Sequence, residues 1–427
     1  MDLAADTGQF ARYSPTSTPI LDVLRPLASR KRDRVGAGEY FFLSSAFIIT
    51  LIGLPWLRQA AASMSSLSLV QSLVMTLLAI PAAALAAALA VHQAGHLMAA
   101  WLAGFRPALR SPGALSSANQ AAGQLYFCEG VSFGPIALEP KKTDGLRRRL
   151  LFLVLAGPAA SLSLPLAMEA MVYMGRFDFL AAFGIHVFSV WSVLLGLADL
   201  LPDAGKGSFS DGARILMLLK NDAAAQRWIH IVERQHALAR GEHPRTWDEA
   251  AVTSDAALDD DSRDAVLARW LGYLWATERQ DITLARKYLE EALAAPASSS
   301  AHLRDRLFTE ATMFQAWFRD DSAKARFWAA HIRMRRLSPL QKSRLGTGLL
   351  WSEGRLFDAW EKLGGYFYLL RAMPASPARD VLEQNAVEWK KQMESRLLTR
   401  AWRTMYSMSQ EVEQSATQQT GAASASV

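Results

Sequence analysis

Residues 91–96 read Val-His-Gln-Ala-Gly-His and lie inside a long aliphatic block, residues 66–103, which decides the fold. A membrane-spanning helix needs about 20 mainly apolar residues to cross about 30 Å of hydrocarbon, and this block exceeds that length. Three further blocks, residues 40–57, 150–174 and 180–201, are similarly apolar. The sequence therefore predicts an all-α, polytopic membrane domain with four spans.

The composition indicates a second environment after these blocks. The chain of 427 residues is 51% hydrophobic and 20% charged, which is more apolar than an ordinary soluble chain. The apolar blocks end before Asp211, and the remaining sequence is mixed. We expect an N-terminal segment over 1–38, a membrane domain over 39–220, a helical domain over 221–408 and a disordered tail over 409–427.

Basic residues predict the orientation in the membrane. One cluster, in residues 25–34, precedes the first apolar block, and a second lies in residues 104–149. Cytoplasmic loops carry an excess of Lys and Arg, so both clusters, and with them both termini, are expected in the cytoplasm. The chain has a net charge of +6, and the predicted topology already explains its basic clusters. We therefore expect no nucleic-acid partner. Cys128 is the only cysteine, so an intrachain disulfide is impossible.

The two histidines of the opening stretch, His92 and His96, lie four residues apart. On a helix this spacing places both imidazoles on one face, about one turn apart, as in helices that donate two ligands to zinc. A pair of core histidines bonded to a neighbouring helix is the alternative. Ionisable residues within a span are costly and generally face a functional interior, which favours metal ligation.

A third ligand is expected from Asp211, which follows the fourth block in the stretch Ser210-Asp211-Gly212. This residue reaches the same side of the membrane as the histidine pair, according to the predicted topology. An acid at this position also stabilises a helix N-terminus, and the two roles are compatible. The sequence thus predicts a Zn²⁺ site formed by His92, His96 and Asp211.

These motifs resemble the site-two protease family over about residues 66–220. That family combines His-Glu-x-x-His on one span with a Gly-Pro-x-x-Asn-like motif, an Asn-x-x-Pro motif and a later Asp-Gly. The resemblance implies a zinc metalloendopeptidase fold that cleaves membrane-protein clients near the cytoplasmic face. It places Gly157, Pro158 and Ser161 at the intermediate motif and Asp199 at the asparagine of Asn-x-x-Pro. By resemblance, these four positions contact substrate.

Gln93 departs from the family pattern, because it occupies the position of the catalytic glutamate. An amide cannot take a proton from zinc-bound water, so activity is in doubt while the metal ligands are retained. Three explanations stay open: a pseudoenzyme that binds metal and clients, an active protease with a displaced base, or a deliberate exchange of the glutamate that traps substrate. The acids on the predicted cytoplasmic side are Glu129, Glu139, Asp199 and Asp203.

A small hairpin at the membrane surface is expected between the second and third blocks. Residues 125–127 and 131–138 read as short strands around Glu129 and Gly130. In site-two proteases such strands can receive an extended substrate.

The C-terminal region, residues 221–408, is helical in pattern, with breaks at Pro244, Pro296, Pro339 and Pro374. Its cadence of aromatic and small residues partly matches the tetratricopeptide repeat. A repeat domain would bind a soluble protein partner, whereas an irregular helical bundle would not need one. A noncatalytic membrane adaptor that recruits a partner through this domain is therefore the alternative function.

Overall fold

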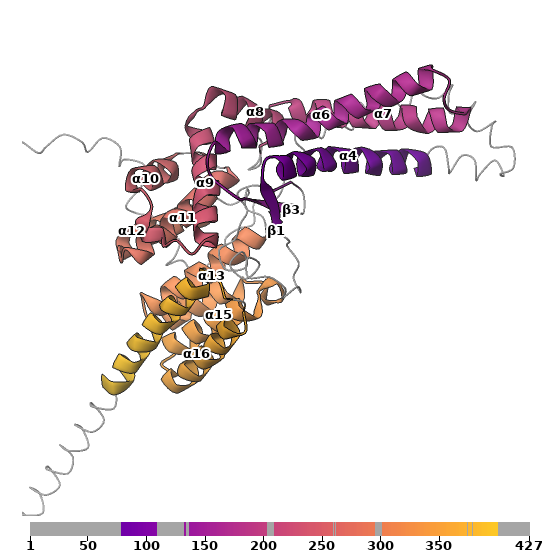
Figure 1. Ribbon diagram of the computed structural model, residues 1–427. Helices are drawn as coiled ribbons and strands as arrows, with labels where there is room; N and C mark the ends of the chain where they lie inside the picture. Colours follow the sequence, from indigo (N-terminus) through magenta and orange to yellow (C-terminus); the bar gives the residue numbers. More distant parts are fainter. Residues whose placement is uncertain are drawn as a thin grey trace, which may run out of the picture. The chain divides into compact units, whose positions relative to one another are not determined.

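A computed structural model (Figure 1) describes residues 78–108, 132–133, 136–202, 209–258, 260, 262–294, 301–373, 375–377 and 379–399. The described part is mostly helical and contains a small antiparallel sheet. The expected first span over 40–57, the N-terminal segment and the tail lie outside the described residues. Glu129 and Asp203, two of the acids considered above, lie outside them as well.

Within the described ranges, three helices are long and apolar enough to cross a membrane: α4 (Ile80–Leu102), α6 (Leu146–Tyr173) and α7 (Phe179–Leu200). At 1.5 Å per residue, the shortest, with 22 residues, extends about 33 Å. They correspond to the second, third and fourth expected spans. Helix α6 begins four residues before the expected 150, because Gly145 adopts a left-handed conformation (φ 60°) and starts the helix ahead of the basic residues.

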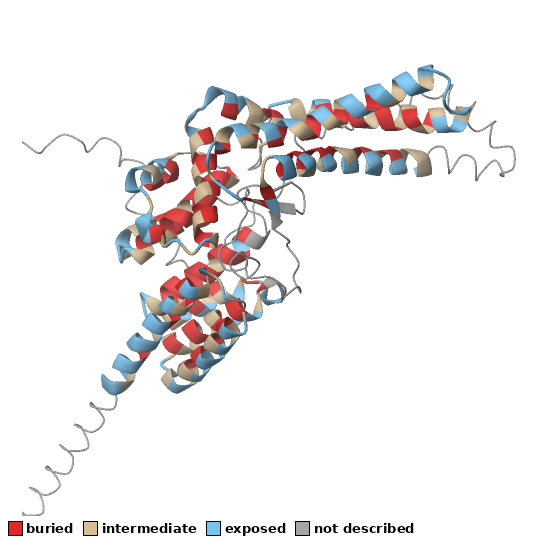
Figure 2. Ribbon diagram, in the orientation of Figure 1, coloured by how far each residue is buried: buried red, intermediate tan, exposed pale blue. Residues whose placement is uncertain are grey.

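The three apolar helices pack side by side (Figure 1) through small residues. A Cβ added to Gly95 of α4 would lie 2.5 Å from the carbonyl oxygen of Ala156 in α6, so only glycine allows this approach. Large apolar side chains such as Leu89 and Leu166 remain exposed. Exposed positions recur along all three apolar helices (Figure 2). Close packing through small residues and an apolar outer surface are both typical of membrane helices.

A three-stranded antiparallel sheet follows α4, with the order β1 (Phe105–Ala108), β3 (Ile136–Pro140), β2 (Ser132–Phe133). In its register Phe105 lies opposite Pro140. The expected single strand over 131–138 is wrong in detail, since this segment contains both β2 and part of β3. The sequence has a Gly-Pro pair at 134–135, and such a pair disfavours one continuous strand. Residues 125–127 lie outside the described residues.

A hydrophobic core joins the C-terminal end of α4 and the N-terminal part of α6 to the sheet and to two following helices, α8 (Asp211–Lys220) and α9 (Ala223–Ala239). Leu150 and Leu153 of α6 are fully buried in it, as is Leu218 of α8. This core fixes α8 against the start of α6.

The chain forms two compact units, which divide between Leu307 and Phe308. In the first unit, η4 (Pro244–Thr246), α10 (Glu249–Ala257), α11 (Arg263–Glu278) and α12 (Ile282–Ala294) follow α9. This unit joins the apolar helices to α8–α12, and a domain boundary at residue 220 stays a prediction from composition.

The second unit is helical throughout its described part. It begins within α13 (Ala301–Trp317) and contains α14 (Ser322–Ala330), η5 (Met334–Arg336), α15 (Pro339–Ser352), α16 (Leu356–Arg371) and a further helix over 379–399. The expected break at Pro339 is confirmed, because this proline starts α15 behind a capping box formed by Ser338 and Gln341. Pro244 likewise begins η4, whereas Pro296 and Pro374 lie outside the described residues.

Candidate metal centre

The two histidines of α4 point toward one another and away from solvent. Their Nε2 atoms lie 3.0 Å apart, and the side chains are 5% and 1% exposed for His92 and His96. The helical spacing predicted from the sequence is thus confirmed. Two imidazole nitrogens that converge in a buried space need a proton or a cation between them, because their lone pairs otherwise repel.

The opposite ring nitrogens are already occupied. His96 Nδ1 lies 2.9 Å from the backbone carbonyl oxygen of Leu153, which can only accept, so Nδ1 carries the hydrogen. In the neutral ring this leaves a lone pair on Nε2. His92 Nδ1 lies 3.0 Å from the Ser161 hydroxyl, which can accept its hydrogen in the same way. Such partners orient histidine ligands in metal sites and fix their tautomer.

Asp211, the first residue of α8, brings a carboxylate to the histidine pair. Its Oδ2 lies 3.0 Å from His96 Nε2 and 3.4 Å from His92 Nε2. Helix α8 reaches this position because Gly212 lies against the end of α7, where a Cβ would overlap the carbonyl oxygen of Leu200. Ser210 caps the helix by accepting from the Ala213 amide at 3.2 Å. Asp211 therefore lies in the first turn of α8, as expected, and its carboxylate is placed where it could hold a metal ion together with the histidines.

The donor atoms fit a divalent cation. One atom each from His92, His96 and Asp211 forms a group whose members lie within 4.8 Å of one another. With bond lengths of about 2.0–2.2 Å, the ligands of tetrahedral zinc lie about 3.4 Å apart, close to the spacings seen here. Asp211 Oδ2 is buried and accepts no hydrogen bond of good geometry from the described residues. Nitrogen and carboxylate donors are also the chemistry that zinc accepts.

The surroundings of Asp211 favour the charged form of its carboxyl group. Burial works to raise the pKa of this group, but the adjacent His92 and His96 outweigh burial and hold the pKa below its ordinary value. The carboxylate is the form in which an acid ligates a metal.

The Gly-Pro-x-x-Ser segment of α6 lies beside the histidines. Gly157 leaves room for His96, since a Cβ there would overlap the imidazole at Nε2. Ser161 is fully buried and bonded to His92, so the structure gives it a contact with a metal ligand, while substrate contact stays a prediction. Pro158 is buried inside α6. The role of Gly157 in making space for an imidazole could not be predicted from the sequence.

Gln93 and the acids considered as a displaced base lie in different surroundings. Gln93 is half-buried on α4 next to His92. Asp199, near the end of α7, places Oδ2 3.3 Å from His92 Nε2. Glu139 of β3 lies instead 3.7 Å from His236 Nδ1 on α9. Among the described acids considered as a base, the structure therefore brings Asp199 to the histidine pair.

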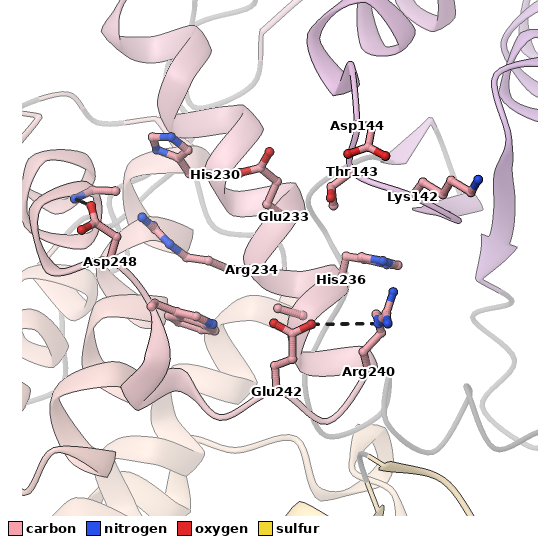
Figure 3. Close-up of a pocket in the computed structure, with 13 residues that line it drawn as sticks. Lys142, Thr143, Asp144, His230, Glu233, Arg234, His236, Arg240, Glu242 and Asp248 are labelled. Carbon is pink, nitrogen blue, oxygen red and sulfur yellow. Dashed lines mark hydrogen bonds and ion pairs between the residues drawn. The ribbon is translucent and has the colours of Figure 1, made fainter.

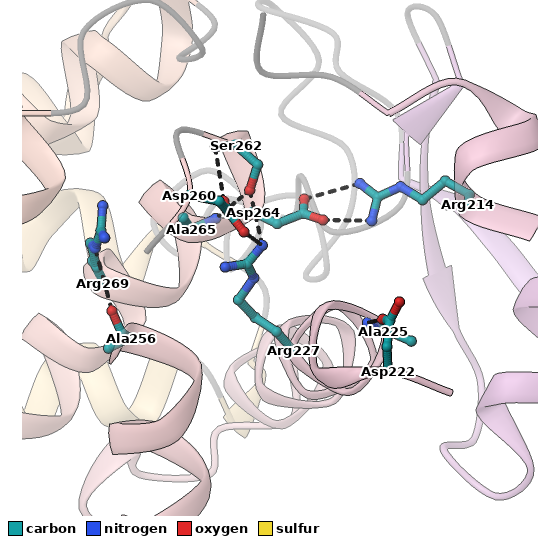
Figure 4. Close-up of polar contacts among 10 residues, drawn as sticks. All are labelled: Arg214, Asp222, Ala225, Arg227, Ala256, Asp260, Ser262, Asp264, Ala265 and Arg269. Carbon is teal, nitrogen blue, oxygen red and sulfur yellow. Dashed lines mark hydrogen bonds and ion pairs between the residues drawn. The ribbon is translucent and has the colours of Figure 1, made fainter. Parts of the chain in front are cut away.

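Helix α8 is anchored from its far side by Arg214 (Figure 4). The guanidinium makes a two-pronged ion pair with Asp264 at the start of α11 and lies 4.1 Å from the ring centroid of Trp228 on α9. Both partners are largely buried, so the anchor holds α8 in one orientation. Arg214 lies one helical turn after Asp211, yet the sequence carried no signal that its partner is 50 residues away.

A cavity of about 670 Å³ lies apart from these donors, between residues 142–144 and the helices α9 and α10 (Figure 3). The buried Arg234 in its wall pairs with Asp255 at 2.8 Å, and burial lowers the pKa of this arginine. The side chains of His92, His96 and Asp211 do not line this cavity. The candidate metal donors therefore lie among the helices α4 and α8 and not in the cavity.

Comparison of the chain with protein-family models, with curated proteins and with solved structures finds no match in any of the three. The resemblance to site-two proteases therefore stays a prediction from the motif residues.

Proposed function

We propose that this chain is a membrane zinc protein of the site-two-protease type that binds membrane-protein clients and is impaired in cleaving them. One observation carries the proposal: His92 Nε2, His96 Nε2 and Asp211 Oδ2 converge in a buried space between apolar helices. The order of these residues along the chain is that of the family, and the helix lengths fit a bilayer.

The impairment follows from Gln93. A bound zinc ion would polarise the scissile carbonyl and lower the pKa of its water to about 7, but the side-chain amide cannot take the proton from that water. General acid–base catalysis accelerates such reactions by about 10²- to 10⁴-fold. Without the glutamate the rate of cleavage should therefore fall to a small fraction of that of an active protease, while client binding is retained. Ser161 and Asp199, at the positions where the family contacts substrate, are consistent with client binding on this side of the histidines.

The proposal also specifies the orientation of the chain. Both termini lie in the cytoplasm, and the metal centre lies near the cytoplasmic face, because α8 and the basic segment before α6 meet there. A client would thus be held where its span enters the cytoplasm.

A noncatalytic adaptor is the second candidate, and the helical hairpins of the C-terminal region favour it. Helices α11 and α12 pack against each other, with Gly272 so near Tyr288 that a Cβ would lie 3.0 Å from the ring. Helices α15 and α16 form another such pair. Paired helices of this kind are the unit of repeat domains that bind soluble proteins. In this case the metal centre only stabilises the bundle that anchors the adaptor.

The test is the zinc content of the detergent-purified full chain, measured by mass spectrometry. About one zinc per chain is expected, and it should be lost in the double variant His92→Ala, His96→Ala. His230→Ala serves as the control, since His230 lies on α9 and pairs with Asp255. Wild-type protein without zinc, or zinc that survives the double substitution, would refute the proposal.

The Gln93→Glu variant then separates the two candidates. Incubated with fluorescent single-span membrane peptides, it should cleave them while the wild-type chain does not, because the substitution restores the proton acceptor. Cleavage restricted to this variant marks the chain as a disabled protease. Silence of both forms, with zinc bound, favours the adaptor.

A further inference from the structure

Asp199 is the second carboxylate at the metal centre, and the proposed protease chemistry does not use it. Its Oδ2 lies 3.3 Å from His92 Nε2, essentially the same separation as the 3.4 Å between this nitrogen and Oδ2 of Asp211. Both values match the distance of about 3.4 Å expected between two ligands of one tetrahedral zinc ion. Asp199 thus lies at a ligand-like distance from one donor, although the group of donors within 4.8 Å of one another consists of His92, His96 and Asp211.

The end of α7 and the start of α8 bring the two carboxylates together. Gly212 follows Asp211 and touches the carbonyl of Leu200, which follows Asp199. The backbone contact is therefore made by the direct neighbours of both acids. The Asp199 side chain is 38% exposed, so it is free to rotate toward the other donors, whereas Asp211 is 14% exposed.

Charge favours the same role. A divalent cation would attract both carboxylates and would offset the repulsion between them. One carboxylate and two neutral imidazoles leave a net positive charge on a zinc site. Two carboxylates balance the double positive charge of the ion. A neutral site has the lower free energy in surroundings of low dielectric constant.

We propose that Asp199 is the fourth protein ligand, so that His92, His96, Asp199 and Asp211 close the metal site. Catalytic zinc sites keep one position open for water, and structural sites fill all four with protein donors. With Asp199 in place, the ion would lack a bound water in the resting chain, and this partly exposed carboxylate would have to rotate away before the Gln93→Glu variant could cleave a client. With Gln93 at the position of the family's glutamate, the site would also lack a base. Both departures from the family then have one consequence, which is a metal that holds helices together. This inference rests on the proposed zinc site.

The experiment compares the full chain with Asp199→Asn, which keeps the shape and removes the charge. Zinc affinity is measured in detergent by competition with a chromogenic chelator. Loss of a partner that only contacts a ligand weakens metal binding by about 10- to 100-fold, so loss of a true ligand should exceed about 100-fold. The control is Asp178→Asn at the other end of α7, where asparagine caps the helix as well as aspartate and affinity should not change.

Cobalt substitution gives a second reading that is independent of activity. Wild-type protein loaded with Co²⁺ should show the visible spectrum of a four-coordinate site, unchanged by added azide. In Asp199→Asn the freed position should take azide, and the spectrum should shift. Equal zinc affinity of the two forms, or a wild-type spectrum that responds to azide, would overturn the role of Asp199 while leaving the three-ligand site intact. A chain that binds neither metal refutes the proposed function itself.

Discussion

His96 donates its Nδ1 hydrogen to the carbonyl oxygen of Leu153 across 2.9 Å, from one apolar helix to the next. A carbonyl oxygen within a helix normally accepts a hydrogen bond from the amide of the residue four positions later. Here the carbonyl oxygen of Leu153 in α6 also orients the His96 ring of α4. It directs the other ring nitrogen of His96, Nε2, to Asp211 and His92. The metal centre is therefore positioned by the backbone of a neighbouring helix as well as by side chains.

Gly157 is expected to tolerate no side chain. Gly157→Ala would place a methyl group on the His96 imidazole, so the ring must leave the site. We expect a loss of zinc and a decrease of about 1–3 kcal/mol in the free energy of unfolding, as is usual for overpacked cores. Thermal unfolding and metal content of the purified variant measure both.

Gly184→Ala is the matched control, because a Cβ at Gly184 in α7 meets nothing within 4 Å. This change should leave zinc binding as it is and should stabilise the helix by up to about 1 kcal/mol. Equal behaviour of the two alanine variants would mean that the space beside His96 is not required.

Ser161→Ala should weaken metal binding without removing a ligand. The substitution deletes the hydroxyl that lies 3.0 Å from His92 Nδ1. Loss of a side chain that hydrogen-bonds to a metal ligand typically lowers metal affinity by about 10- to 100-fold. Chelator competition measures the change. Ser189→Ala is the control, since the Ser189 hydroxyl is buried without a hydrogen-bond partner among the described residues. Indistinguishable affinities of the two variants would contradict the role assigned to Ser161.

Asp260 should contribute stability that depends on pH (Figure 4). Burial works to raise its pKa, but hydrogen bonds from Ser262 and Arg227 outweigh burial, so the folded pKa lies below the ordinary value. Stability from this acid is then complete above the unfolded pKa of about 4 and is lost as the pH falls through the lower folded value. At pH 7, Asp260→Asn should cost about 1–2 kcal/mol, between the values for exposed and buried pairs, because Arg227 is fully buried.

Melting temperatures recorded between pH 3 and pH 7 test this expectation. The difference in melting temperature between wild type and Asp260→Asn, here called the gap, should be constant above about pH 4 and should become smaller below it. Asp358→Asn, which removes an exposed pair with Arg355, should show almost no gap. A gap for Asp260→Asn that widens in acid would show that the carboxylate is not stabilised by folding.

Cys128 offers a test of the predicted topology, because it is the only cysteine. A membrane-impermeant maleimide should label it only after the cells are opened, since residues 104–149 are expected in the cytoplasm. In the pair Cys128→Ser, Ser63→Cys, the new thiol lies in the loop after the first expected span and should react in intact cells. Labelling of Cys128 from outside would reverse the orientation and place both termini outside.

The sequence predicted the parts of the site that depend on local spacing and order. His92 and His96 followed from helical periodicity, and Asp211 followed from its position after the fourth apolar block. The ion pair between Arg214 and Asp264 depends on how α8 and α11 meet, which no local pattern encodes. The same holds for the acceptor of His96, because any carbonyl of a neighbouring span could have served. Asp199 was expected to contact substrate, and its distance from His92 became visible only in the folded chain.

The position of Asp211 outside the apolar helices has a mechanical consequence. Its helix, α8, has 10 residues and shares one core with α9, the end of α4 and the start of α6. A cation at the centre would add a second link between α8 and the helix that holds His92 and His96. Force or torsion applied to α9 by a bound protein would then be carried by the metal–ligand bonds as well as by the core, and withdrawal of the ion would leave the core as the link that remains.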